Sequence, residues 1–254
     1  MAYKLGCLPK KFSAKTLHFP KYVLADAPLP PYTSKSYYEY LIAADAWLML
    51  GNDQYGDCAT AGPAHEVMNR TAHRGKGMMV TPTMADIFAM YAAICPGFSP
   101  GPPPVNDNGA AITDALNYML LTGLAGEKID GWAEIDPSNV ENIKRGIHIF
   151  GSVNIGVNLP QSAMDQTNAG QAWDVVADDG GILGGHCVVL MGYGADGCTA
   201  ITWGQLQQIT WAWFAAYCQE AYVELASDWI AASGLAPNSL DMATLTADLA
   251  LLKS

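Results

Sequence analysis

The 254-residue chain has little charge and no long apolar run. Charged residues make up 15% of it, against roughly 25% in an average soluble protein. No uncharged apolar stretch approaches the roughly 18 residues of a membrane-spanning helix, and the start lacks the apolar core of a secretory signal. We therefore expect a protein that is synthesised inside a cell, has no signal peptide and no membrane partner, and works in the cytoplasm or in a virion-like assembly.

Spacings typical of metal sites and disulfide frameworks are also missing. The six cysteines include no CxxC pair, and His65, His73 and His148 match neither an HExxH nor a finger pattern. In a chain without a secretory signal, such cysteines are expected to be free thiols. We predict no metal and no cofactor.

Positive charge is concentrated at the N-terminus. The net charge is -11, yet six of the thirteen basic residues are lysines within the first 35 positions, and no Lys or Arg lies between Gly146 and Leu252. An acidic body repels phosphate backbones, so no nucleic-acid partner is expected. Prolines make residues 1–48 an extended basic arm. The arm is either a solvated tail or docks on an acidic surface, its own or that of a neighbour in a homo-oligomer or larger protein assembly.

Helical patterns come first along the chain and strand patterns second. Apolar residues recur at helical spacing over 40–48, after Cys58, and over 87–94, 112–119, 140–147 and 240–252, whereas 153–157, 187–193 and 199–203 read as strands. This order predicts an α+β protein: an arm over 1–48, a helical lobe over 49–130, a β-rich lobe over 131–225 and a C-terminal helical extension over 226–254. The aromatic run 211–217 is either a helix packed on the β-hairpin or an exposed docking surface.

One cysteine and one histidine stand where catalytic residues are expected. Cys58 follows Asp57 at the predicted start of a helix, where unpaired backbone N–H groups stabilise a thiolate. His186 follows two glycines at the entrance of a strand, 128 residues downstream. This separation is close to the 130–150 residues between the Cys and His of the papain pattern.

These elements, in this order, resemble the papain-like cysteine peptidase superfamily. The resemblance implies a two-lobe fold, with a helical N-terminal lobe and an antiparallel β-sheet C-terminal lobe. It also implies that Cys58 is the nucleophile and His186 the general base and then acid. The oxyanion donor that the family places six residues before the nucleophile falls on Asn52, while Gln54 lies four before, and both carboxamides remain candidates.

The resemblance has one consequential departure. Aligning Trp203-Gly204 with the corresponding family landmark puts Ile201 at the position of the family's ring-orienting Asn. The sequence thus predicts either a thiol hydrolase that cleaves a peptide or isopeptide bond in a peptide or protein substrate, or a catalytically weakened papain-like scaffold. The second would act as a structural or interaction subunit of a viral or other large assembly.

Overall fold

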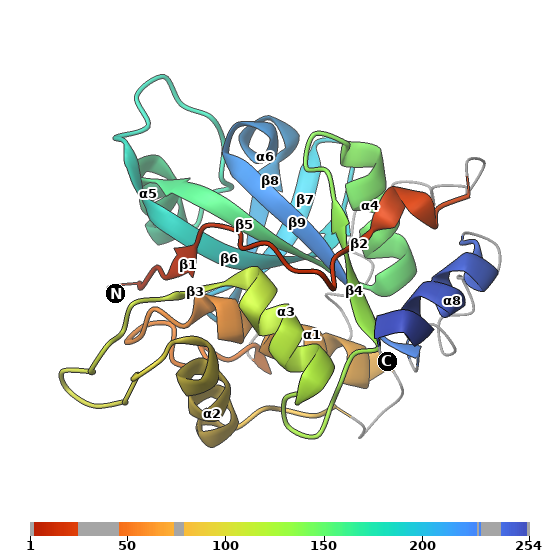
Figure 1. Ribbon diagram of the computed structural model, residues 1–254. Coiled ribbons are helices and arrows are strands. Elements are labelled where there is room, and N and C mark those ends of the chain that lie inside the picture. Colours follow the sequence, from red (N-terminus) through yellow and green to blue (C-terminus); the bar gives the residue numbers. More distant parts are fainter. Residues whose placement is uncertain (1–2, 25–45, 74–78, 228, 230–239, 253–254) are drawn as a thin grey trace.

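The computed structural model consists of two lobes that face each other, with the N-terminal segment running between them (Figure 1). It describes residues 3–24, 46–73, 79–227, 229 and 240–252. The predicted α+β class is confirmed, because three helices form one lobe and a seven-stranded sheet forms the other. Residues 40–45 of the predicted 40–48 helix lie outside the described residues. None of the described helices is long and apolar enough to cross a membrane.

The first lobe is built from helices α1 (Cys58–His73), α2 (Met84–Ile94) and α3 (Ile112–Leu121). Helix α1 is buried from Cys58 to Thr71, so it forms the centre of the lobe. A capping box starts α2: the Thr83 hydroxyl accepts from the Asp86 N–H at 3.3 Å, and the Asp86 carboxylate accepts from the Thr83 N–H at 2.8 Å. The helix patterns predicted over 87–94 and 112–119 are thereby confirmed.

The second lobe is one sheet with the strand order β2-β4-β9-β5-β6-β7-β8. Strand β2 lies parallel to β4 at one edge, and the other neighbours are antiparallel. The strands are β2 (Leu17–His18), β4 (Gly131–Ile135), β5 (Val153–Pro160), β6 (Ile182–Tyr193), β7 (Gly197–Thr202), β8 (Gln205–Thr210) and β9 (Cys218–Leu225). Helices α4 (Val140–Phe150), α5 (Gln161–Asn168) and α6 (Trp211–Tyr217) belong to this lobe.

The aromatic run over 211–217 is part of the core. Trp213 and Phe214 of α6 have no exposed surface and pack in the same cluster as Trp173 and Trp203. Of the two interpretations left open by the sequence, packing against the sheet is therefore the one that the structure supports.

Close contact between α1 and β6 joins the two lobes. A Cβ on Gly62 would lie 2.9 Å from the Cys187 sulfur and 3.2 Å from the Asn154 side chain, so only a glycine lets the helix approach the strand this closely. The first residue of α1 and the middle of β6 are thus brought to the same place. This contact positions both Cys58 and His186.

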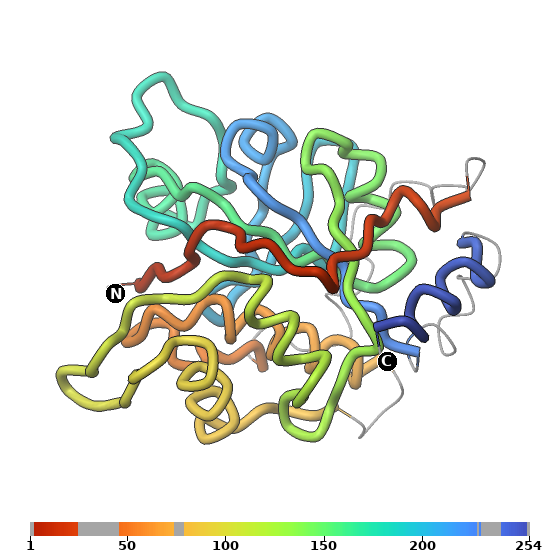
Figure 2. The backbone as a smooth tube through the Cα atoms, viewed as in Figure 1, coloured from red at the N-terminus to blue at the C-terminus, as the bar shows by residue number. Residues whose placement is uncertain are grey.

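The N-terminal arm docks on its own chain. Figure 2 shows it as a red tube that passes along the boundary of the two lobes. Its strand β1 (Cys7–Leu8) pairs with β3 (Ala110–Ala111) of the helical lobe, whereas β2 extends the sheet of the other lobe. A short 3-10 turn, η1 (Phe19–Lys21), follows, and its end packs beside the C-terminal helix α8 (Met242–Leu252).

Candidate active site

Cys58 is the first residue of helix α1 and is buried, with 1% of its surface exposed. The preceding Asp57 accepts from the N–H groups of Thr60 and Ala61 through its backbone oxygen, at 2.7 and 3.0 Å, which starts the helix. The thiol therefore lies at the positive end of the helix dipole, where a thiolate is stabilised. Pro63 lies inside the helix without delaying this start.

His186 lies in β6 with its two ring nitrogens in different surroundings. Nε2 lies 2.7 Å from the Thr202 hydroxyl, and the Trp203 ring stacks on the imidazole with centroids 4.4 Å apart. Nδ1 is buried and has no hydrogen-bond partner. The ring is thus held by a hydroxyl on one edge and an indole on its face, which leaves Nδ1 for another group.

Thr202 corrects the sequence-based assignment of Ile201 to the ring-orienting position. Ile201 pairs with Val189 across β6 and β7 and packs on Met68, away from the imidazole. Side chains alternate between the two faces of a strand, so the next residue, Thr202, points to the face that carries His186. The histidine therefore has a polar partner, although the expected position carries an isoleucine.

The backbone of the residue after His186 reaches the start of α1. The N–H of Cys187, the residue after His186, donates to the Cys58 thiol, as do the N–H groups of Gly6 and Ala59. Cys187 turns its own thiol toward the Asn154 side-chain oxygen at 2.9 Å, so it packs on the opposite face of β6. The structure thus brings together the start of α1 and the backbone that follows His186, one from each lobe.

The structure distinguishes the two oxyanion candidates by burial. Asn52 is 2% exposed, whereas Gln54 lies on the surface. The Asn52 side-chain amide donates to the Tyr55 backbone oxygen at 3.1 Å, and its backbone oxygen accepts from the Lys4 N–H at 3.1 Å. Asn52 is therefore the buried one of the two candidates, and one N–H of its amide is engaged locally by the Tyr55 oxygen.

Residues 3–8 of the arm cover the pair. The Gly6 N–H donates to the Gly185 oxygen at 3.2 Å, and the Gly6 oxygen accepts from the Ala110 N–H at 2.9 Å, so this residue bridges both lobes. Tyr3 stacks on the outer face of Trp203 with centroids 4.4 Å apart. The arm thus binds by its backbone across the site and keeps water from it.

The cover keeps both candidate catalytic groups neutral. Burial raises the pKa of the Cys58 thiol to about 12, and the N–H donors around it offset only part of this effect. Burial lowers the pKa of His186 to about 3. Because desolvation penalises the charged form of each group, the closed site holds a thiol and a neutral imidazole at pH 7.

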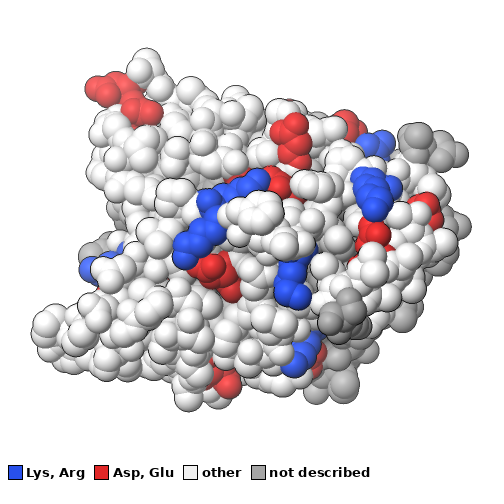
Figure 3. All heavy atoms as spheres, in the orientation of Figure 1, with Lys and Arg blue, Asp and Glu red and all other residues white. Residues whose placement is uncertain are grey.

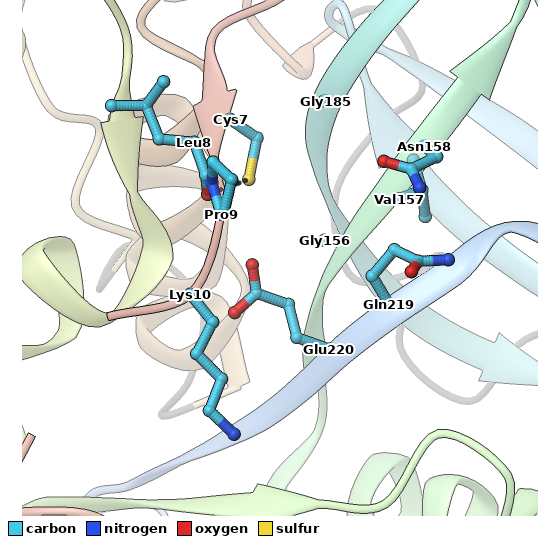
Figure 4. Close-up of a pocket in the computed structure, with 10 residues that line it drawn as sticks. All are labelled: Cys7, Leu8, Pro9, Lys10, Gly156, Val157, Asn158, Gly185, Gln219 and Glu220. Atoms are coloured by element: carbon cyan, nitrogen blue, oxygen red, sulfur yellow. Dashed lines mark hydrogen bonds between the residues drawn. The ribbon is translucent and has the colours of Figure 1, made fainter. Parts of the chain in front are cut away.

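A pocket of about 320 Å³ adjoins the covered pair (Figure 4). Its walls come from the arm and from β5, β6 and β9, and Figure 4 shows the Glu220 carboxylate pointing from β9 toward the arm. Glu220 is 5% exposed and accepts from the Tyr222 hydroxyl at 2.6 Å. Among the described residues, no group of three His, Cys, Asp or Glu side chains is arranged to hold a metal ion.

Comparison with solved structures identifies the architecture. The chain superposes on xylellain, a cysteine protease from Xylella fastidiosa, with a TM-score of 0.64, 11% identity, and coverage of 89% of this chain and 97% of that one. It also matches procathepsin B S9 from Trypanosoma congolense, with a TM-score of 0.57, 12% identity, and coverage of 87% and 86%. The fold is papain-like. No family model and no curated protein matches the chain.

A third match to the papain-like fold is digestive procathepsin L 3 of the Tenebrio molitor larval midgut. Its TM-score is 0.54 at 8% identity, and the match covers 88% of this chain and 76% of that one. The superpositions establish the fold. At identities this low, the chemistry has to be argued from the residues of this chain.

Two features of this site were missed from the sequence. Thr202 could have been found by counting strand alternation from the apolar Ile201, because the neighbouring residue must face the other way. Gly6 is the only glycine among the first 50 residues. A lone glycine in an extended segment indicates a close approach of another backbone, and the charge of the arm alone does not contain this signal.

Proposed function

We propose that the protein is a thiol hydrolase that cleaves a peptide or isopeptide bond through Cys58 and His186. The observation that carries the proposal is the placement of a cysteine at a helix N-terminus against the backbone N–H of the residue that follows a histidine. The histidine has a hydroxyl behind one nitrogen and an unpaired second nitrogen. These are a nucleophile, a base and a group that orients the base.

Each residue has one task in the reaction. His186 Nδ1 takes the Cys58 proton, and the thiolate attacks the substrate carbonyl carbon to form a tetrahedral intermediate. The helix N-terminus and Asn52, once its amide turns from Tyr55, stabilise the oxyanion. The imidazolium then protonates the leaving amine, and a water molecule, deprotonated by His186, hydrolyses the thioester and regenerates the thiol.

Activity requires that the arm leave the site. Exposure to water removes most of the desolvation that raises the Cys58 pKa and lowers the His186 pKa, so the thiolate and imidazolium forms become accessible. The closed form is therefore a latent state.

The proposal is tested in a full-length variant that displaces the arm, Gly6→Ala, because a Cβ there would lie 1.9 Å from the Gly56 backbone oxygen. In this background we expect hydrolysis of a casein-derived peptide mixture, its loss in Cys58→Ser, and its retention in the matched variant Cys187→Ser. Hydrolysis that survives Cys58→Ser, or none in the Gly6→Ala protein although Cys58 reacts with iodoacetamide, would overturn the assignment.

A second candidate function is a weakened scaffold that serves as a subunit of a larger assembly. The observation that favours it is the engagement of the Asn52 amide with the Tyr55 oxygen, which occupies one of the two N–H donors of that carboxamide. It predicts a native oligomer that survives Cys58→Ser and dissociates when the arm is displaced. Light scattering of the Gly6→Ala and parent proteins at two salt concentrations distinguishes this function from hydrolysis.

A further inference from the structure

The arm lies on a row of carboxylates that belongs to the body of the protein. Lys10 pairs with Glu134 at 2.5 Å, and Lys11 pairs with Asp114 at 2.6 Å, so the lysines that follow β1 each meet an acid. Figure 3 shows blue basic atoms beside red acidic atoms on this face. We call Glu134, Asp114 and Glu220 the acidic track.

Glu220 extends the acidic track into the pocket beside the site. Lys10 is the only cation among the described residues that line this pocket, and it comes from the arm. Its charge acts on the Glu220 carboxyl and lowers the pKa of that group, against the larger upward effect of burial. The pocket therefore offers a carboxylate whose nearest cation departs with the arm.

Release of the arm removes the lysines that lie on the acidic track. Residues 3–24 carry five lysines and no acid, so removing this +5 segment from a chain of net charge -11 leaves a body of net charge -16. Strands β5 to β9 supply no replacement, since no Lys or Arg occurs between Gly146 and Leu252. Carboxylates that converge on a groove of low dielectric attract a ligand of opposite charge.

We propose that the open groove binds lysine-rich peptide segments, with Glu134, Asp114 and Glu220 as the residues that select them. The proposal rests on the proposed function for the cleavage step and goes beyond it by naming the substrate class. Its support is the arm, which lies across both lobes as a bound peptide with Lys10 on Glu134 and Lys11 on Asp114. The negative sign excludes nucleic acid as the occupant.

The pairs are partly exposed, which sets the size of the effect. The lysine side chains are 46% and 56% exposed and their partners 21% and 27%. Each ion pair alone therefore adds little binding free energy. Long-range attraction by all the carboxylates adds to it and speeds the association of a basic peptide. At 20 mM salt we expect kcat/KM for a lysine peptide to exceed that of its glutamate counterpart about tenfold. At 0.5 M salt the ratio should fall to about two, because exposed charges are screened.

The experiment uses full-length Gly6→Ala protein and two quenched-fluorescent octapeptides. The two peptides differ only at four alternate positions, which are all lysine in the first peptide and all glutamate in the second. Glu134→Gln combined with Asp114→Asn should lower the ratio of kcat/KM values clearly below that of the Gly6→Ala protein, with Glu220 accounting for the preference that remains. The matched control is Glu141→Gln, the same change of charge on α4 away from the groove, and it should keep the preference.

The outcomes separate this proposal from the hydrolase assignment. Equal cleavage of both peptides, or a preference that the double variant retains in full, overturns the acidic track and leaves the hydrolase intact. If neither peptide is cleaved, fluorescence anisotropy of the same peptides decides: tighter, salt-sensitive binding of the lysine peptide supports the track alone, and equal binding overturns it.

Discussion

Replacing Gly6 by alanine should open the site, because the arm has no room for a side chain where it crosses the helical lobe. A Cβ on Gly6 would lie 1.9 Å from the Gly56 oxygen and 2.5 Å from its carbonyl carbon. Both are backbone atoms just before α1 and cannot rotate away. The arm must move outward by more than about 1 Å to reach ordinary van der Waals distance.

The movement breaks the two backbone hydrogen bonds of Gly6, at 3.2 Å to Gly185 and 2.9 Å to Ala110. At about 1 kcal/mol each, their loss weakens the closed state by about 2 kcal/mol. This corresponds to an open population about 30 times larger than in the parent protein. Steric repulsion adds to the effect, so the figure is a lower bound.

The assay is iodoacetamide labelling at pH 7, with the rate measured separately for each cysteine by mass spectrometry. If opening and closing are faster than labelling, the Cys58 rate follows the open population, so it should rise about 30-fold in Gly6→Ala. Cys95 and Cys198, which are buried away from the arm, report global unfolding and should keep their rates.

The matched control is Leu8→Ala, which trims a 37% exposed side chain of the same strand and keeps its backbone pairing. It should leave Cys58 labelling within about twofold of the parent. An unchanged Cys58 rate in Gly6→Ala, or a rise shared by Cys95, would refute the view that backbone contact at Gly6 keeps the site covered.

Three further changes test other parts of the structure. Thr202→Val removes the hydroxyl that holds His186 Nε2 and should lower kcat about 10- to 100-fold in the arm-displaced protein, with Thr202→Ser restoring most of it. Glu66 has a pKa raised by burial and by Glu224, so its stabilising contribution is present at low pH and is lost as the pH rises through the folded-state pKa. Glu66→Gln should therefore raise the free energy of unfolding in urea by about 1 kcal/mol more at pH 8 than at pH 5; an equal gain at both pH values would contradict this. Asp248→Asn removes the negative charge that α8 presents to Lys21 and the Tyr22 hydroxyl, both at 2.6 Å, and should speed Cys58 labelling only a few-fold, because these contacts lie beyond β2.

Local patterns were sufficient to predict most of the elements. The capping box at Thr83 and the apolar stripe after Asn139 mark where α2 and α4 begin, and the apolar runs around Val153 and Val189 became β5 and β6. These signals depend on neighbours within a few residues, which the sequence displays directly. The candidate nucleophile could be predicted for the same reason, since Cys58 stands where its helix begins.

The partner of His186 was missed because a family landmark, and not strand alternation, was used to select it. Aligning Trp203-Gly204 with a family landmark selected Ile201, but the face on which a residue lies depends on the pairing of β7 with β6, and that pairing contains an irregularity between Leu190 and Gly192. A shift of one residue exchanges the two faces of a strand. The correct residue is the neighbour of the one selected, as expected for an error of register.

The destination of the arm was open for a different reason. The positive charge of the arm predicts that it binds an acidic surface. It does not predict whether that surface belongs to the same chain or to a neighbour, because long-range attraction is not specific for one position. Position is set by short contacts: Gly6 against Gly56 and Gly109, and Gly185 against Cys7, where each added Cβ would approach backbone atoms to 2.2 Å or less. Four glycines from distant parts of the chain must meet to make this crossing, and no local pattern contains that information.

Charge and backbone contact therefore have separate roles in covering the site. The lysines bring the arm to the acidic track and make its binding sensitive to salt, whereas the glycine crossing brings the Gly6 N–H to the Cys58 sulfur and excludes water. High salt alone should loosen residues 10–24 and leave Cys58 covered. A change at Gly6, or a competing peptide that offers both lysines and a backbone to Gly185 and Ala110, should remove the cover and expose Cys58 to solvent.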